Sequence, residues 1–263
     1  MLTVPNWSFY DPPLARRITD ELLSRGLTVH YCQGDEDHGR TVIAFSGSFL
    51  DLKTAILWIA DLVFPSIDLR MHRGVHPRIG ALDVCPFIGL PPYPSLVEFA
   101  ALFEERYSVP VSLYGHSGSA SLTSLRRDGV VASRWGSTVM GFRDWLLAVN
   151  FSLPGQDVAL VKRLAREIRI RRNAGDPLFA GVQALGFGLV IADLAQLSLN
   201  FTRPDETSVD DVRAWLPATG WIPELIGVIR ERDLPNATCL RPTPSQIIGG
   251  EKSPEDLRYR SPQ

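Results

Sequence analysis

Residues 70–90 read RMHRGVHPRIGALDVCPFIGL, and the rest of the chain is organised around this stretch. An alternating apolar run at 67–71 leads into it and predicts a strand, and a second apolar run at 84–88 leads out of it. Gly74 and Pro77 exclude a regular helix between the two runs. The stretch therefore predicts two strands joined by a sharp, non-helical connection.

The connection carries a histidine with an arginine on either side. Pro77 favours an extended backbone at His76, which lies between Arg73 and Arg78. An imidazole has an unperturbed pKa of about 6.5, which suits a general base, and guanidinium groups match the two oxygens of a carboxylate. Two interpretations stay open: a base for carboxylate-bearing substrates, or a turn histidine bonded to the backbone. A metal pair with His72 is disfavoured, because the four-residue spacing needs a helix that this connection excludes.

The composition is that of an ordinary globular protein. The chain has 263 residues, 45% hydrophobic and 21% charged, with a formal net charge of −2. This balance favours neither nucleic acid nor an anionic membrane as a partner. The three cysteines show neither a zinc spacing nor a disulfide framework, and no apolar run is long enough for a membrane helix. We expect a cytoplasmic protein without a metal ion, acting on small molecules.

Strands and helices alternate along the chain, and their order repeats. In the first half, strands are predicted at 2–7 (an edge strand), 27–33, 40–47 and 109–114, and helices at 11–26, 48–64 and 94–107. In the second half, strands are predicted at 137–142, 146–153, 182–190, 194–201 and 237–240, and helices at 157–172 and 208–232. This β-α-β-β-α-β order predicts an α+β fold of two similar ferredoxin-like subdomains.

The polar segment 115–135, rich in Gly, Ser and Arg, is the predicted boundary. We expect an N-terminal subdomain over residues 1–134, a C-terminal subdomain over 135–250 and a polar tail over 251–263. A cleft between two such halves is a common place for a ligand.

The motif HRGVHPRIGALDVCPF at 72–87 closely resembles the HRG-x-HPRxGAxDVxPF signature of glutamate formiminotransferases, the formimino-transferring part of formiminotransferase-cyclodeaminase. The resemblance covers most of the chain. It extends to VPNWS from Val4, DHGRTV from Asp37, VPVSLYG from Val109, WGSTVMGFRDWLLAVNFSL from Trp135, DLAQLSLNFT from Asp193 and PSQIIGG from Pro244. It implies that His76 is the catalytic base and that Cys85 is a strand residue rather than a nucleophile.

The chain departs from the family pattern in places that concern the ligand. The segment ahead of Trp135, which helps bind folate in the family, is reduced to 126–134, and His116 stands where glutamate is common. The acidic residues expected near Tyr31 and Gln33 are also missing. These departures affect the folate platform and an acidic partner rather than the catalytic base.

The resemblance implies transfer of a formimino or formyl group from N-formiminoglutamate to N5 of tetrahydrofolate, in histidine degradation and one-carbon metabolism, by a homodimer. Tetrahydrofolate is then the co-substrate, and one histidine removes the amine proton and returns it to the leaving nitrogen. Two alternatives remain. One is a transferase on the same scaffold with a different acceptor, and the other is a non-catalytic paralogue that binds a ligand or a partner subunit.

Both substrates carry carboxylates, so arginines are candidate clamps. The candidate substrate-binding residues are Arg40, Arg73, Arg78, Arg143, Asn150 and Asn200. The candidate folate contacts are Trp135, whose ring could stack on a pterin, and Gly136 and Gly141, which could admit a close backbone approach. Each has a simpler alternative: a solvated charge for an arginine, a backbone partner for an asparagine, packing for the tryptophan and a turn for a glycine. Asp83 is expected to orient a neighbour.

Overall fold

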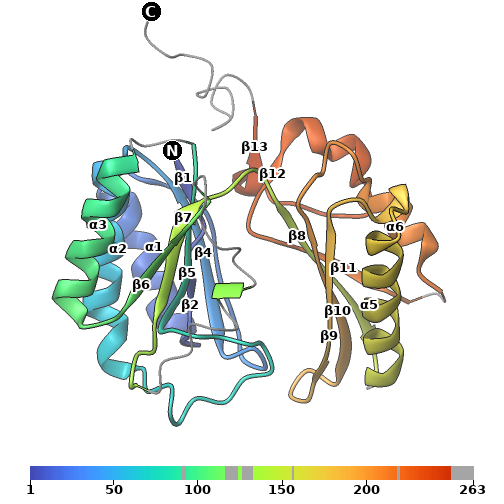
Figure 1. The fold of residues 1–263 in the computed structure, drawn as a ribbon, viewed down its shortest axis with the longest axis horizontal. Helices are drawn as coiled ribbons and strands as arrows, with labels where there is room; N and C mark the ends of the chain where they lie inside the picture. Colours follow the sequence, from blue (N-terminus) through green and yellow to red (C-terminus); the bar gives the residue numbers. More distant parts are fainter. Residues whose placement is uncertain (90–92, 116–123, 126–132, 156, 218–219, 250–263) are drawn as a thin grey trace, which may run out of the picture. The chain divides into compact units, whose positions relative to one another are not determined.

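The computed structural model describes residues 1–89, 93–115, 124–125, 133–155, 157–217 and 220–249. Its internal contacts divide the chain into two compact units, Met1–Arg143 and Asp144–Ser253. Both units combine a β-sheet with helices (Figure 1), which confirms the predicted α+β class. The expected tail at 251–263, His116 and most of the shortened segment 126–134 lie outside the described residues.

The first unit is built on one seven-stranded sheet. Its strands are β1 (Leu2–Thr3), β2 (Asn6–Trp7), β3 (Thr28–Asp35), β4 (Arg40–Ser46), β5 (Leu82–Ile88), β6 (Val111–Tyr114) and β7 (Thr138–Phe142). The strand order is β1-β4-β2-β5-β7-β6, with β3 paired to β4, and β7 runs parallel to both β5 and β6. Because β7 belongs to this sheet, the division after Arg143 falls later in the chain than the predicted boundary at 134.

Residues 2–7, predicted as an edge strand, lie in the middle of this sheet. β1 and β2 each pair with β4 on one side and with β5 on the other. Leu2 and Trp7 are both fully buried. The prediction was wrong because a short apolar run does not reveal how many neighbours it has in a sheet.

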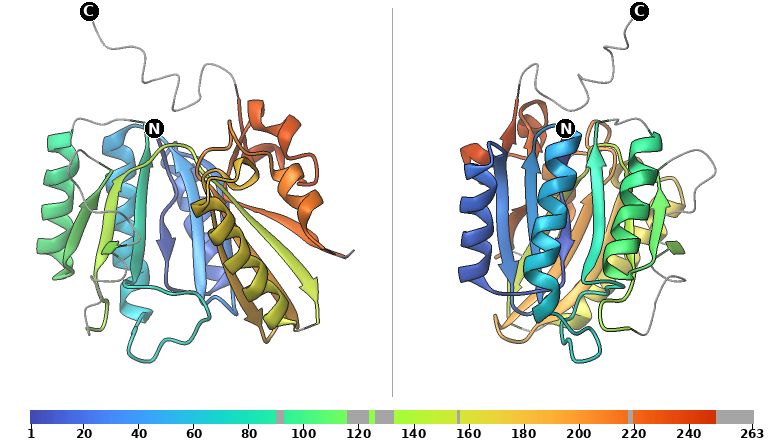
Figure 2. Two further views of the ribbon diagram at one scale, coloured as in Figure 1. Left: turned by 45° about the vertical axis from the view of Figure 1, so that its right-hand side comes forward. Right: turned by 90° about the vertical axis from the view of Figure 1, so that its left-hand side faces the viewer.

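Three helices of the first unit cover one face of the sheet (Figure 2). They are α1 (Pro12–Ser24), α2 (Phe49–Val63) and α3 (Tyr93–Tyr107), and a 3-10 turn, η1 (Phe64–Ser66), follows α2. The first two helices begin at polar caps. The Asp11 side chain accepts a hydrogen bond from the backbone N–H of Leu14, and Ser48 accepts one from that of Asp51.

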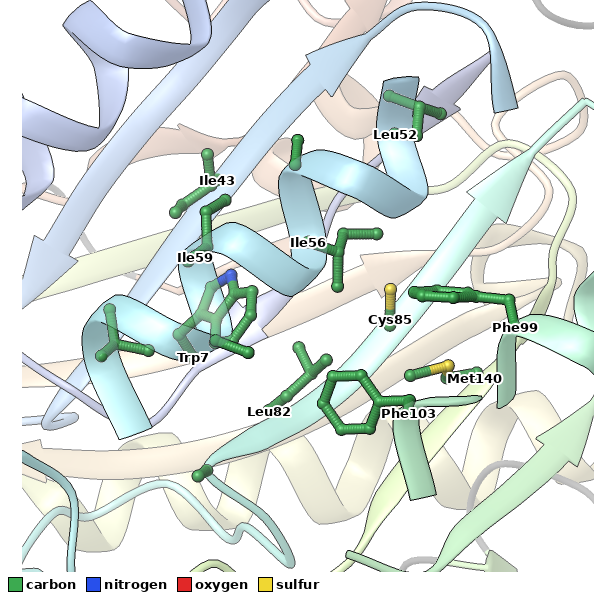
Figure 3. Close-up of a cluster of buried hydrophobic side chains, with 14 of the residues drawn as sticks. Trp7, Ile43, Leu52, Ile56, Ile59, Leu82, Cys85, Phe99, Phe103 and Met140 are labelled. Atoms are coloured by element: carbon green, nitrogen blue, oxygen red, sulfur yellow. The ribbon is translucent and has the colours of Figure 1, made fainter. Parts of the chain in front are cut away.

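Beneath these helices, side chains from the sheet and from α2 and α3 pack into one buried cluster (Figure 3). Trp7, Ile56, Phe103 and Met140 come from four different elements and meet there. Cys85 lies in the same cluster, and burial raises the pKa of its thiol to about 12. This cysteine is therefore a packing residue of β5, as the sequence predicted.

The connection between α2 and β5 differs from the prediction at its start. Residues 67–71, predicted as a strand, form a turn in which the Met71 N–H donates to the Asp68 carbonyl at 3.0 Å. The Asp68 carboxylate also accepts hydrogen bonds from the Arg70 backbone and guanidinium, and Met71 is 77% exposed. The sharp, non-helical connection around Pro77 and the strand that follows it are confirmed.

The second unit contains β8 (Leu147–Pro154), α5 (Val158–Asn173), β9 (Val182–Leu189), β10 (Leu194–Phe201), α6 (Val209–Trp215) and β11 (Ile222–Ile226). Its four strands form an antiparallel sheet in the order β11-β8-β10-β9, and α5 lies along one face against β9 and β10 (Figure 1). The remaining elements are β12 (Ile229–Arg230), which pairs with β13 (Ile247–Ile248), and the 3-10 turns η2 (Pro177–Phe179), η3 (Glu231–Asn236) and η4 (Pro244–Gln246).

Two predictions in the second unit were wrong. The helix expected over 208–232 ends at Trp215, and the chain returns as β11, which pairs with β8. Pro217 lies just beyond the helix and cannot continue it. The strand expected at 237–240 is a turn, in which the N–H of its last residue donates to the carbonyl of its first at 3.1 Å.

Candidate active site around His76

Two loops of the first unit meet at His76. One is the β3–β4 turn, residues 36–39, and the other is the His76 loop, residues 72–80, which leads into β5. The Val75 N–H donates to the Asp37 carbonyl at 3.0 Å. The imidazole rings of His38 and His76 lie 5.7 Å apart between centroids, tilted by 55°. These contacts bring together two segments that lie far apart in the sequence.

Arg78 lies where the two loops touch. Its Nη1 donates to the Gly39 carbonyl at 2.9 Å and to Nε2 of His72. Its Nη2 donates to the His38 carbonyl at 2.5 Å and to the His76 carbonyl at 3.2 Å. Burial lowers the pKa of Arg78, and the Asp83 carboxylate opposes this, but a guanidinium keeps its charge at any physiological pH. Two of its nitrogens therefore hold acceptors from both loops.

His76 is partly exposed, and a backbone group orients its ring. Its Nδ1 lies 2.7 Å from the Pro77 carbonyl oxygen. A carbonyl only accepts, so Nδ1 carries the proton in this contact, and in the neutral ring Nε2 then has the lone pair. This is the backbone contact expected of a turn histidine, and it involves only Nδ1.

Glycines make the close approach of the two loops possible. A Cβ on Gly74 would lie 2.3 Å from the His38 carbonyl oxygen and from Nη2 of Arg78. Gly39 has a φ of 57°, and a Cβ there would lie 2.6 Å from Nε2 of His72. A side chain at either position would push the loops apart.

The far end of the His76 loop is fixed to the sheet. The Asp83 carboxylate accepts the Ile79 N–H at 2.9 Å, so Asp83 orients a neighbour, as expected. The Ser8 hydroxyl donates to the Gly80 carbonyl at 2.7 Å, and the Ser137 N–H donates to the Ile79 carbonyl at 2.9 Å. The loop that carries His76 is therefore held at its middle and at its end.

Three of the four predicted arginine clamps lie in or beside these loops. Arg78 and the exposed Arg73 belong to the His76 loop, and Arg40 directly follows the β3–β4 turn as the first residue of β4. Arg143 is placed elsewhere. It follows β7 at the Phe87 end of the β5–β7 pair, whereas the His76 loop enters β5 at the other end. At about 3.3 Å per residue, roughly 16 Å of strand separates the two ends.

The predicted folate contacts engage protein groups of the first unit. The Trp135 indole N–H donates to the Phe64 carbonyl at 2.8 Å, and the two rings lie 5.2 Å apart. Gly136 has a φ of 65°, and a Cβ there would lie 1.9 Å from the Ile79 carbonyl oxygen. A Cβ on Gly141 would lie 2.2 Å from the carbonyl oxygen of its sheet neighbour. Packing and close strand approach account for all three residues.

Asn150 and Asn200 lie in the second unit, on one face of its sheet. Ser198 is directly opposite Asn150, and Asn200 is two residues further along β10, so all three share a face. The opposite face meets α5, where a Cβ on Gly186 would lie 2.7 Å from the helix backbone. Ser152, Gln196 and Glu224 share the asparagine face by register, and the Gln196 side chain donates to the Ser152 hydroxyl at 3.3 Å.

Sequence reasoning missed residues at the His76 site and on the polar sheet face of the second unit. The alternation of Gln196, Ser198 and Asn200 along β10 would have revealed the polar face, because alternate residues of a strand share a face. His38 was missed although it lies in the DHGRTV motif, and its ring packs on that of His76. No local pattern places it there, since the two histidines meet only through the folded sheet.

The described ranges contain neither a membrane-spanning helix nor a cluster of metal-binding side chains. None of their helices combines the length and the apolar character that a membrane span needs. They contain no group of three or more His, Cys, Asp or Glu side chains placed to hold a metal ion. His72 and His76 instead contact Arg78 and a backbone carbonyl.

Comparison with known proteins connects this site to a family. Residues 1–135 match the formiminotransferase domain, N-terminal subdomain. The formimidoyltransferase-cyclodeaminase of Sus scrofa is 31% identical over an alignment of 241 positions, which covers 76% of this chain and 44% of that protein. The glutamate formimidoyltransferase of Thermoplasma acidophilum is 27% identical over 88% of each chain, and that of Streptococcus pyogenes is 25% identical over 70% of each. The chain thus spans less than half of the pig protein but most of the other two. With the His76 loop inside the matched region, this chain belongs to the glutamate formiminotransferase family.

Proposed function

We propose that this chain is a one-carbon transferase that moves a formimino group from N-formiminoglutamate, or a formyl group from an N-formyl amino acid, to N5 of tetrahydrofolate, with His76 as general base. The names of its relatives support the reaction class. The single observation that carries the role of His76 is the contact of its Nδ1 with the Pro77 carbonyl at 2.7 Å, which leaves Nε2 as the proton acceptor.

In the proposed reaction, the N5 amine attacks the amidine carbon of the donor, and Nε2 of His76 takes the amine proton. The tetrahedral adduct then collapses as the imidazolium returns this proton to the departing glutamate nitrogen. No proton is gained or lost overall, and the histidine ends in its starting tautomer because the Pro77 carbonyl holds the Nδ1 proton throughout. Positioned proton transfer of this kind typically contributes about 10²–10⁴ in rate.

Within this proposal, Arg40 and Arg73 bind substrate carboxylates, because they lie in or next to the two loops that meet at His76. For Asn150 and Asn200 we propose a ligand-contacting role within the second unit itself, where they offer neutral hydrogen-bonding groups on one face of its sheet. We further propose ferredoxin-like subdomains, which the β-α-β-β-α-β order and the β11-β8-β10-β9 arrangement of the second unit support. A cytoplasmic homodimer acting in histidine degradation is proposed from the family resemblance.

The test is a transfer assay with purified protein, N-formiminoglutamate and tetrahydrofolate, in which mass spectrometry follows the N5-substituted product. His76→Ala is expected to lower kcat by about 10²–10⁴ while the unfolding midpoint is unchanged. His30→Gln is the matched control, since His30 lies on β3 and bonds to the Ser46 hydroxyl. Equal activity in His76→Ala and wild type would remove His76 from the mechanism.

Calorimetry with tetrahydrofolate separates this function from its alternatives. Binding together with turnover supports the proposal. No heat at millimolar tetrahydrofolate, with the donor still bound, would point to a different acceptor on the same scaffold. Donor binding without turnover by any acceptor would point to a non-catalytic ligand-binding protein.

A further inference from the structure

We propose that Arg78 is a positioning residue, which fixes the His76 loop to the β3–β4 turn rather than binding a substrate carboxylate. The inference rests on the proposed function, since it assumes that the placement of His76 matters for transfer. The sequence had instead predicted that Arg78, which lies next to the candidate base, binds a substrate carboxylate.

The donors of Arg78 support this role. A guanidinium has five N–H donors, and four of those on Arg78 point to protein acceptors. Nη1 holds Gly39 O and His72 Nε2, and Nη2 holds His38 O and His76 O. Bidentate binding of a carboxylate needs two donors side by side. Only Nε–H remains after these four contacts, so Arg78 cannot take a carboxylate in this way without releasing a loop.

The hydrogen bonds of Arg78 connect the two loops and are not confined to one of them. Nη2 bridges the His38 carbonyl in the β3–β4 turn and the His76 carbonyl in the His76 loop. Gly74 fits against both partners, because a Cβ there would lie 2.3 Å from Nη2 of Arg78 and from the His38 carbonyl oxygen. Gly74 therefore leaves the space that the guanidinium fills. We call this contact of Arg78 and Gly74 with the β3–β4 turn the joint between the two loops.

The joint acts on the base through the backbone of His76. Arg78 holds the carbonyl of His76, and the next carbonyl along the chain, that of Pro77, orients the imidazole. Release of this backbone would shift Nε2 relative to bound substrate, and a displacement of about 1 Å can cost roughly 10²-fold in rate. Such a loss should be larger in kcat than in KM, because Arg73 moves with the loop but Arg40, the first residue of β4, keeps its place in the sheet.

The first readout needs no activity. Arg78→Lys keeps the charge and a trypsin site but replaces the planar fork by one nitrogen, and Gly74→Ala opens the same joint without altering Arg78. Arg17→Lys, at an exposed position on α1, is the matched control. In folded protein, trypsin should cut after Arg73 at least about tenfold faster in both joint variants, the change expected when one net hydrogen bond is lost. The rate in the control should match wild type.

The second readout is steady-state kinetics of the same variants, with circular dichroism to confirm folding. A positioning role predicts a kcat lowered about 10²-fold in Arg78→Lys and Gly74→Ala, with a smaller change in the KM for the donor. A raised KM with kcat retained in Arg78→Lys would identify a carboxylate clamp and overturn the inference. Unchanged trypsin cleavage in both variants would overturn it as well. If wild type transfers no group, the proposed function fails, and the cleavage rates still decide whether Arg78 holds the loop.

Discussion

Mild acid should weaken the joint between the two loops, because His72 accepts a hydrogen bond from Arg78 only in its neutral form. Burial first, and then the charge of Arg78, lower the pKa of His72 from 6.5 to about 4, while a contact with the Gly39 backbone opposes this. When the loop is undocked, the pKa returns to its ordinary value. The docked loop therefore disfavours protonation. Its stabilisation by neutral His72 is complete above about pH 6.5 and is lost as the pH falls toward 4.

The size of the effect follows from the same two values. The difference between 6.5 and about 4 sets an upper bound of roughly 3.4 kcal/mol, at about 1.36 kcal/mol per pKa unit. The His72 side chain is only half-buried, and solvent screening reduces this to about 1–2 kcal/mol. Hydrogen exchange of the His76 loop amides, corrected for intrinsic rates, should then be about 5- to 30-fold faster at pH 4.5 than at pH 7.

An NMR titration of the histidine ring protons measures the underlying pKa directly. The signal that disappears in His72→Gln belongs to His72, and its midpoint should lie near 4. In Arg78→Met the midpoint should rise only part of the way to 6.5, because burial is the larger cause of the low pKa. A midpoint near 6.5 in the wild-type protein would refute the claim that His72 is a neutral partner of Arg78.

Two further predictions concern the residues first considered as folate contacts. Trp135→Phe removes the N–H that bonds to the Phe64 carbonyl, so the free energy of unfolding in urea should fall by about 1–3 kcal/mol while the KM for tetrahydrofolate stays constant. An unchanged stability with a raised KM would instead indicate pterin stacking. Gly136→Ala should cost at least about 2 kcal/mol, because its Cβ would meet the Ile79 carbonyl and its φ is positive. Gly26→Ala is the control, with a φ of 79° and open space around it, and equal losses in the two variants would contradict the proposed clash.

The sequence predicted best where backbone chemistry is local. Gly74 and Pro77 exclude a helix by themselves, and the structure has the sharp connection they predict. The same local logic failed at 67–71, where alternating apolar residues resemble a strand, but the Asp68 carboxylate bonds to the Arg70 backbone and closes a turn. A side-chain-to-backbone hydrogen bond of this kind competes with regular structure, and apolar alternation gives no sign of it.

The sequence did not predict which residues distant in the chain pair or form hydrogen bonds with one another. Residues 222–226 become a strand only because β8 offers a free edge for pairing, and no local pattern shows that edge. The candidate site behaves in the same way. The motif predicted that Arg78 lies beside His76, but its acceptors His38 and Gly39 stand 40 and 39 positions away in the chain. The fold determines which acceptors lie within reach of a guanidinium. For this reason Arg78, predicted to bind a substrate carboxylate, is now proposed to hold the two loops together.

The central claim is that Nε2 of His76 moves the proton during transfer. Single-turnover transfer, measured across pH with saturating donor and acceptor in wild type and His76→Ala, tests it most directly. We predict a wild-type rate that falls as acid protonates the base, and a variant that is about 10²–10⁴-fold slower and has lost this acid limb. A variant with the wild-type rate, or with the same acid limb, would contradict the claim.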